Sequence, residues 1–368
     1  MSELVATSEA LHARVRAFAR RESEESFEAL ALAVARFQAR HVPGFARLVK
    51  VRDGSLEELA RVPGVPTDAF RLSRVAVHPS ELDVARFATS GTTGRDRGIH
   101  PFRTTRTYEE LALLFGRLAL CASEGPRVVA ALAPAPVTPP ESSLGFMLDL
   151  FQRAWDGRDF DGRPLPAGTP GAFLLEASGV DVPGLERAAT VAVRRGEPLL
   201  VLTTAFALVA VLDALGGGTF PAPENTVVMV TGGFKGRSRE VPRAELTAST
   251  ARAFGIPEAQ VIGEYGMTEL SSQLYEGTLP GGALRARPGV FVEPRWLRVE
   301  PVDPATLAAV PDGEVGIARI VDLGNVDSAL VIQTEDLVRR TDGGVELFGR
   351  RPGAPARGCS LAVEALLG

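Results

Sequence analysis

Features that mark secreted, membrane-spanning and nucleic-acid-binding proteins are scarce in this sequence. Its 368 residues contain two cysteines, Cys121 and Cys359, which are too few for a disulfide framework and fit a reducing cytoplasm or one reactive thiol. Residues 1–20 lack the apolar core of a secretory signal, because charged side chains interrupt their apolar positions. The formal net charge of −5 makes DNA or RNA a poor candidate for the main partner. We therefore expect a cytoplasmic protein that does not act on nucleic acid.

No apolar run is long enough to span a bilayer. The most hydrophobic stretch, residues 198–212, is bounded by Glu197 and Asp213 and is shorter than the roughly 20 residues that a spanning helix needs. We interpret it as a buried strand followed by a buried helix. The composition, with 45% hydrophobic and 23% charged residues, is that of a folded globular chain and excludes extensive disorder.

Hydrophobic periodicity divides the chain into three parts. Residues 1–85 predict a helical segment, since Phe27, Leu30, Val34 and Phe37 recur at helical spacing. In residues 86–290, short apolar runs alternate with amphipathic ones, which is typical of an α/β fold with parallel βαβ units. Strands are expected at 127–134, 172–177, 198–204, 225–233 and 259–266, and helices at 142–156, 183–196, 205–217 and 242–255. Residues 291–368 contain short alternating runs, which predict a small β-rich subdomain built as a meander or small barrel.

A run of small polar residues follows the apolar stretch "VARFA". It consists of Thr89, Ser90, Gly91, Thr92, Thr93 and Gly94. Hydroxyls and unhindered backbone N–H groups in such a loop suit phosphate oxygens, and Arg95 and Arg97 add positive charge at its exit. It is not a Walker A loop, because the pattern G-x-x-x-x-G-K-[ST] is absent. His100, shortly after the loop, could contact phosphate or act as a base.

Two further motifs lie at expected strand ends. In "GEYGMTEL", Tyr265 could lie flat against a planar base, and Thr268 could donate to a phosphate. Glu269 could hold a hard cation such as Mg²⁺ through oxygen. In "TGGFKG", Lys235 could reach an anionic group, because open α/β sheets bind ligands at the carboxyl ends of their strands. A plain strand end and a tight turn with a solvated lysine remain alternative readings of these two motifs.

The C-terminal region holds a fourth motif, "TEDLVRR" followed by "LFGRRPGAPARGCSL". Asp336 could accept hydrogen bonds from ribose hydroxyls, and Arg350 could bridge to ribose or phosphate. Ordinary surface turns would explain the same residues. No group of His and Cys has the spacing of a metal site.

Together and in this order, the four motifs resemble the adenylate-forming (ANL) superfamily of acyl and aryl ligases. "TSGTTG" resembles the phosphate loop of that superfamily, "YGMTE" its adenine, phosphate and Mg²⁺ motif, "TED" its ribose-binding aspartate motif and "GR…ARG" its hinge. The resemblance implies ATP and Mg²⁺ as cofactors and a carboxylic acid as substrate. It assigns ATP binding to Thr89, Ser90, Gly91, Thr92, Thr93, Gly94, Tyr265, Gly266, Thr268, Asp336 and Arg350, and the metal to Glu269.

A narrower resemblance covers nearly the whole chain. Superfamily members continue past the hinge into a lid domain with a catalytic lysine, whereas this sequence stops soon after that motif, so we expect no lid and Lys235 in place of its lysine. "ARGCSLAVE", with "TGGFKG" and "SSLGFM" upstream, looks like the LuxE-type acyl-protein synthetases. That resemblance implies a long-chain fatty acid, its transfer to Cys359 as a thioester and delivery to a reductase or carrier protein. The catalytic residues expected are Cys359, Lys235 and His100.

Two other functions stay open at this point. A ligase could pass the acyl group to coenzyme A or to an amine. Alternatively, the chain could be a nucleotide-binding subunit without catalysis, which the expected absence of a lid lysine would favour.

Overall fold

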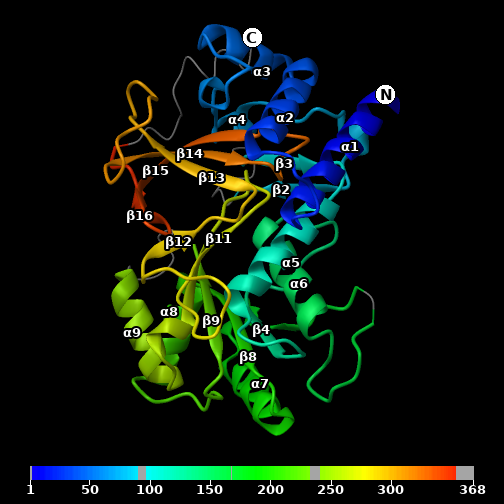
Figure 1. The fold of residues 1–368 in the computed structure, drawn as a ribbon. Coiled ribbons are helices and arrows are strands. Elements are labelled where there is room, and N and C mark those ends of the chain that lie inside the picture. The colour runs from blue at the N-terminus through cyan, green and yellow to red at the C-terminus, as the bar shows by residue number, and fades with distance from the viewer. Residues whose placement is uncertain (1, 90–96, 167, 233–240, 354–368) are drawn as a thin grey trace.

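The computed structural model describes residues 2–89, 97–166, 168–232 and 241–353 of the chain (Figure 1). The N-terminal part of this structure is helical. Its helices are α1 (Ser2–Ala19), α2 (Phe27–His41), α3 (Pro43–Val51) and the short α4 (Ala69–Leu72). The Ser26 side chain caps α2 by accepting from the backbone N–H of Ala29, and Pro43 occupies the first turn of α3. The predicted N-terminal helices are therefore confirmed.

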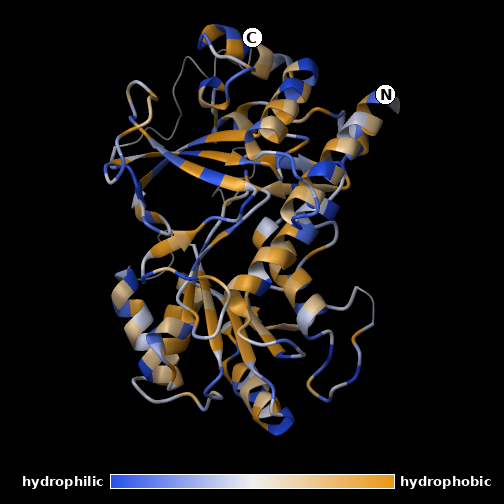
Figure 2. Ribbon diagram, viewed as in Figure 1, coloured by the Kyte–Doolittle hydropathy of each residue, from blue (hydrophilic) through white to orange (hydrophobic). Residues whose placement is uncertain are grey.

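Parallel strands form one half of a twelve-stranded sheet. In space they follow the order β10 (Val261–Tyr265), β9 (Val227–Thr231), β8 (Leu199–Thr204), β4 (Val128–Leu132) and β5 (Ala172–Phe173). Figure 2 shows these strands as largely hydrophobic. Side chains on both faces are buried, which explains why the runs in the sequence do not alternate between apolar and polar residues.

Helices cover both faces of this parallel half. On one face lie α5 (Arg106–Leu120) and α6 (Ser143–Trp155), which share a hydrophobic cluster with Leu200 and Leu202 of β8. On the other face lie α7 (Val182–Arg195), α8 (Ala205–Leu215) and α9 (Arg243–Phe254), which pack with Val201 of the same strand. The alternation of neighbouring strand residues between the two clusters is the period of two expected for a sheet covered on both sides.

Most of the predicted elements of this region are confirmed. Four of the five predicted strands match β4, β8, β9 and β10, and the four predicted helices match α6 to α9. The stretch 198–212 is a buried strand followed by a helix, and across the described residues no helix is both long and apolar enough to cross a bilayer. The prediction at 172–177 is only partly right. The chain leaves the sheet after β5, and β6 (Leu175–Glu176) pairs instead with β7 (Gly179–Val180) in a small hairpin.

Apart from β1 (Val65–Pro66), which pairs in parallel with β15 (Val331–Thr341), the second half of the sheet is antiparallel. It continues from β10 through β11 (Leu274–Glu276), β12 (Val290–Val292), β16 (Gly344–Arg350), β15 (Val331–Thr341), β14 (Val315–Asp322) and β13 (Leu297–Val302). Figure 1 shows this part above the parallel strands. The meander expected after residue 290 is confirmed, and its strands extend the large sheet instead of closing a separate barrel. The division at residues 85 and 290 stays a prediction.

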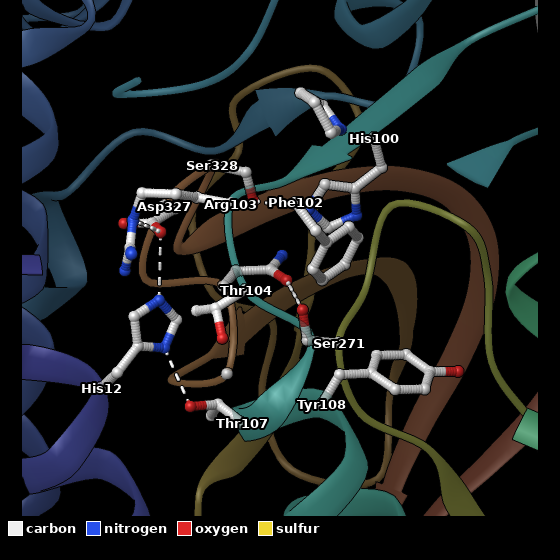
Figure 3. A pocket seen from close by; sticks show the side chains of 13 residues that line it. His12, His100, Phe102, Arg103, Thr104, Thr107, Tyr108, Ser271, Asp327 and Ser328 are labelled. Atoms are coloured by element: carbon white, nitrogen blue, oxygen red, sulfur yellow. Dashed lines mark hydrogen bonds and ion pairs between the residues drawn. The ribbon is translucent and has the colours of Figure 1, made fainter. Parts of the chain in front are cut away.

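A buried polar network fixes α1 to the rest of the fold. Asp327 accepts hydrogen bonds from the Ser8 hydroxyl and from Arg103 Nε at 3.2 Å, and it pairs with His12 Nε2 at 3.1 Å. His12 Nδ1 lies 2.9 Å from the Thr107 hydroxyl of α5 (Figure 3). The pocket beside this network measures about 10 Å³, the space of one water molecule. The network therefore holds α1 against α5 and the loop after β14.

We expect Asp327→Asn to destabilise the protein by about 3 kcal/mol, because it removes the buried carboxylate from the Arg103 guanidinium and leaves the exposed Glu9 as its anionic partner. Urea denaturation would measure the loss, and hydrogen exchange would locate the loosening in α1. The matched control is Asp161→Asn, because Asp161 pairs with Arg163 where both side chains are exposed. Equal denaturation midpoints for the two variants would contradict this account of the network.

Candidate active site

Two predicted motifs meet at the carboxyl ends of neighbouring parallel strands. Thr231 ends β9, and it pairs in register with Glu264 of β10. Gly266, Thr268 and Glu269 follow β10 directly. Ligands of open α/β sheets bind outside this edge, so the fold places these residues where a ligand is expected. Lys235 belongs to residues 233–240, which lie outside the described part of the chain.

The stem of the predicted phosphate loop is held closed. The loop joins β2 (Ala85–Ala88) to β3 (Ile99–Phe102), which pair as antiparallel strands. Thr89 N donates to Gly98 O at 2.9 Å, and Gly98 N donates to the Thr89 hydroxyl at 2.8 Å. Arg97 Nε also donates to Thr89 O, at 2.7 Å. The rest of the loop lies outside the described residues: Ser90, Gly91, Thr92, Thr93 and Gly94.

His100 connects this hairpin to the segment after β10. Its Nδ1 lies 2.8 Å from the carbonyl oxygen of Thr268, and its Nε2 lies 2.8 Å from the Ser328 hydroxyl (Figure 3). Because a carbonyl only accepts, Nδ1 carries the proton and the neutral ring accepts from Ser328 at Nε2. Burial lowers the pKa of His100 to about 4, against the opposing effect of the Thr268 bond, so the ring is neutral near pH 7. Direct contact of His100 with phosphate, or its action as a base, stays a prediction.

The backbone around Glu269 is held by further buried groups. Asn325 Nδ2 donates to Glu269 O at 2.9 Å, and Ser271 donates from its hydroxyl to Asn325 Oδ1 at 2.7 Å. Ser271 N donates to Asp322 Oδ2 at 2.8 Å. Burial raises the pKa of Asp322 to about 6, although three backbone N–H groups and the Ser272 hydroxyl lower it. The segment that carries Thr268 and Glu269 is thus fixed by several independent partners.

The donor set near Glu269 suits Mg²⁺. A carboxylate is the hard oxygen ligand that Mg²⁺ prefers, and this ion commonly takes only one or two carboxylates together with substrate phosphates and water. Within the described ranges, no group of three or more His, Cys, Asp or Glu residues could hold a metal by itself. Glu269 would then be the carboxylate ligand of such a metal.

Tyr265 joins the strand-end motif to the C-terminal motif. Its hydroxyl donates to Asp336 Oδ2 at 2.7 Å, and burial together with the Asp336 carboxylate raises the pKa of Tyr265 well above its usual value. Asp336 on β15 pairs in register with Arg350 on β16, whose side chain is exposed. The fold thus brings together three residues of the predicted nucleotide site that lie far apart in the sequence.

Glu264 is a buried acid that the motifs did not reveal. It is 6% exposed, and one of its carboxylate oxygens accepts from the Thr231 hydroxyl. It lies two positions after Ile262, which packs on the α5 and α6 face, so Glu264 shares that face. Burial raises the pKa of Glu264 to about 7, although the Thr231 bond lowers it. An acidic residue at the end of an otherwise apolar strand was the signal in the sequence.

This raised pKa predicts a pH-dependent stability difference. A carboxyl whose pKa rises on folding favours the folded state most at low pH, and that contribution is lost as pH rises toward 7. Glu264→Gln is isosteric and does not titrate, so its stability relative to the natural protein should increase by about 2 kcal/mol between pH 5 and pH 8. Urea denaturation at both pH values measures this, with the exposed Glu258→Gln as control. A pH-independent difference for Glu264→Gln would refute the shift.

Solved structures of other proteins share the fold of this chain. No protein-family model and no curated protein matches the chain. An open conformation of 2-hydroxyisobutyryl-CoA ligase in complex with 2-HIB-AMP and CoA is 15% identical, with a TM-score of 0.59, over 87% of this chain and 73% of that one. The postadenylation state of that ligase with 2-HIB-AMP is also 15% identical, with a TM-score of 0.62, over 88% of this chain and 67% of that one.

A third solved structure, ATP-bound MatB from Rhodopseudomonas palustris, is 16% identical with a TM-score of 0.50. The match covers 74% of this chain and 49% of MatB, so this chain spans about half the length of that protein. At such identities the likeness establishes the fold. The predicted α/β architecture is confirmed, and proteins that share the fold include 2-hydroxyisobutyryl-CoA ligase.

Proposed function

We propose that this protein activates a carboxylic acid with ATP, forming an acyl-adenylate and releasing pyrophosphate. The observation that carries the proposal is the hydrogen bond between Tyr265 and Asp336 at the carboxyl end of β10, beside the segment of Thr268 and Glu269. It joins the residue that the motifs assign to adenine with the residue that they assign to ribose, next to the segment assigned to phosphate and metal. Neighbours of the same fold support the reaction, since one was solved with 2-HIB-AMP and another with ATP.

The chemistry requires charge to be neutralised where two anions meet. A carboxylate oxygen attacks the α-phosphorus of ATP, the bond from that phosphorus to the bridging oxygen breaks, and pyrophosphate leaves with the electron pair. Backbone N–H groups and cations near the phosphates favour this step. In the proposal, Asp336 accepts from the ribose hydroxyls, Tyr265 lies against the base and Glu269 would hold Mg²⁺, which when bound neutralises phosphate charge. Lys235 is the proposed additional cation.

The second step of the proposal transfers the acyl group to Cys359. The thiolate attacks the carbonyl carbon of the adenylate, the bond to the phosphate oxygen breaks, and AMP leaves. Cys359 lies outside the described residues, so the support for this step comes from the sequence. "ARGCSLAVE" resembles the corresponding segment of LuxE-type acyl-protein synthetases. The same resemblance supports a long-chain fatty acid as substrate and a reductase or carrier protein as the final acceptor.

A second candidate function is transfer of the acyl group to coenzyme A. The observation in its favour is that 2-hydroxyisobutyryl-CoA ligase, which shares the fold, was solved with both its adenylate and CoA. The first half of the reaction would be the same. The acceptor thiol distinguishes the two candidates.

We expect ATP–pyrophosphate exchange that depends on an added carboxylic acid. Asp336→Asn should raise the KM for ATP by roughly 10–100-fold, because a hydrogen bond to a charged group is worth about 1.5–3 kcal/mol. Asp342→Asn, in the exposed turn between β15 and β16, is the matched control and should leave the exchange unchanged. Absence of exchange with every acid in a panel of short, long and aromatic acids would overturn the proposal.

Labelled fatty acid and ATP should leave a label on the protein that survives denaturation and is released by neutral hydroxylamine. The label should vanish in Cys359→Ser and persist in Cys121→Ser, since Cys121 is half-buried at the end of α5 and burial raises the pKa of its thiol. Label retained in Cys359→Ser would exclude this acceptor. Undiminished acyl-CoA formation by that variant would establish the second candidate.

A further inference from the structure

Two buried side chains each hold one carbonyl group of the Thr268–Glu269 segment. His100 donates from Nδ1 to Thr268 O at 2.8 Å, and Asn325 donates from Nδ2 to Glu269 O at 2.9 Å. His100 is 2% exposed and Asn325 is 1% exposed. Buried donors and acceptors without partners are costly, so these bonds select one conformation of the segment.

We propose that His100 is a positioning residue for MgATP, which fixes the distance between the stem of the phosphate loop and the Thr268–Glu269 segment. The inference rests on the proposed function, because that function places nucleotide phosphates against both sides. His100 acts through the backbone of Thr268 and not by touching the nucleotide. Its role is therefore distinct from the direct catalytic role that the sequence suggested.

The geometry of β3 supports this role. His100 lies two residues after Gly98, whose backbone closes the loop stem with Thr89, and it pairs in register with Phe87 of β2. A displacement of His100 would therefore move the stem as well as the Thr268 carbonyl. Misplacement of reacting groups by about 1 Å can cost roughly 100-fold in rate.

The ring itself is held in one orientation. Ser328 donates to Nε2, and the rings of Phe70 and Phe102 lie 5.4 Å and 4.3 Å from the imidazole centroid. Figure 3 shows His100 beside Ser328 and Phe102. Ser328 follows Asp327, the residue that anchors α1. These contacts keep Nδ1 directed at Thr268. Both ring nitrogens are hydrogen-bonded to other residues of the protein.

A pair of amide substitutions tests the inference. His100→Asn places an amide nitrogen at the position of Nδ1, so it can keep the bond to Thr268. His100→Gln places the amide at the position of Nε2, so it can keep the contact with Ser328 but not the bond to Thr268. Both variants are polar, neutral and able to fill part of the imidazole volume. Circular dichroism and thermal melting would establish that each variant is folded.

Calorimetric titration with MgATP and steady-state pyrophosphate exchange give the two readouts. We expect His100→Gln to weaken MgATP binding by about 10–100-fold while the KM for the acid changes less than about 3-fold. His100→Asn should stay within about 5-fold of the natural protein for both ligands, because its amide can restore the bond to the Thr268 carbonyl. A general loss of folding would weaken the binding of MgATP and of the acid in parallel. A loss of MgATP binding with little change in the KM for the acid therefore distinguishes positioning from misfolding.

Three outcomes would overturn the inference. Equal MgATP affinity of His100→Gln and the natural protein would show that the bond does not position the site. Equal impairment of His100→Asn and His100→Gln would show that the donor to Thr268 is not the cause. If the natural protein itself failed to bind MgATP, the proposed function would fail and the inference with it, which separates that result from the first two. Should one variant not fold, Ser328→Ala is the substitute, because it removes the hydrogen bond that orients the His100 ring. It should weaken MgATP binding more than binding of the acid.

Discussion

The structure depends on how the chain is held where the sheet changes from parallel to antiparallel. After β10 the chain must cross from one half of the sheet to the other, and the crossing segment carries Thr268 and Glu269. Buried polar side chains hold its backbone: His100 from β3, and Asn325 and Asp322 from the end of β14 and the loop that follows it. Because each of these groups would be costly if left unpaired, the crossing has one conformation. The same loop anchors α1 through Asp327, so the N-terminal helices and the candidate site share one support.

Burial also sets the electrostatics of this region. It raises the pKa of Glu264 and of Asp322, and it lowers the pKa of His100, so the three groups all shift toward their neutral forms. In such surroundings charges interact more strongly than in water. The binding free energy of a nucleotide phosphate placed against the loop and the Thr268–Glu269 segment would therefore depend strongly on the few cations and N–H donors that reach it.

Local patterns in the sequence predicted much of the fold, and the residues show why the rest was missed. The apolar run at 198–204 and the amphipathic run at 183–196 could be recognised from the pattern of neighbouring residues alone. The structure shows them as the expected strand β8 and helix α7. The run at 172–177 is equally apolar, but it is divided between β5 and a separate hairpin, which only the pairing partners decide.

The order of the motifs predicted that Tyr265 and Asp336 serve one site, and their side chains do meet. The bond from His100 to Thr268 joins residues 168 positions apart, and no spacing rule reveals it. Lys235 and Cys359 lie outside the described residues, so their roles stay predictions.

The most direct test of the account is a crystal structure with a non-hydrolysable acyl-adenylate analogue. The account predicts that the ribose hydroxyls bond to Asp336, that the adenine lies against Tyr265 and that the phosphate mimic sits between the loop after Thr89 and Thr268. An analogue bound away from the carboxyl ends of β9 and β10, or one that leaves Tyr265 and Asp336 without contact, would contradict it.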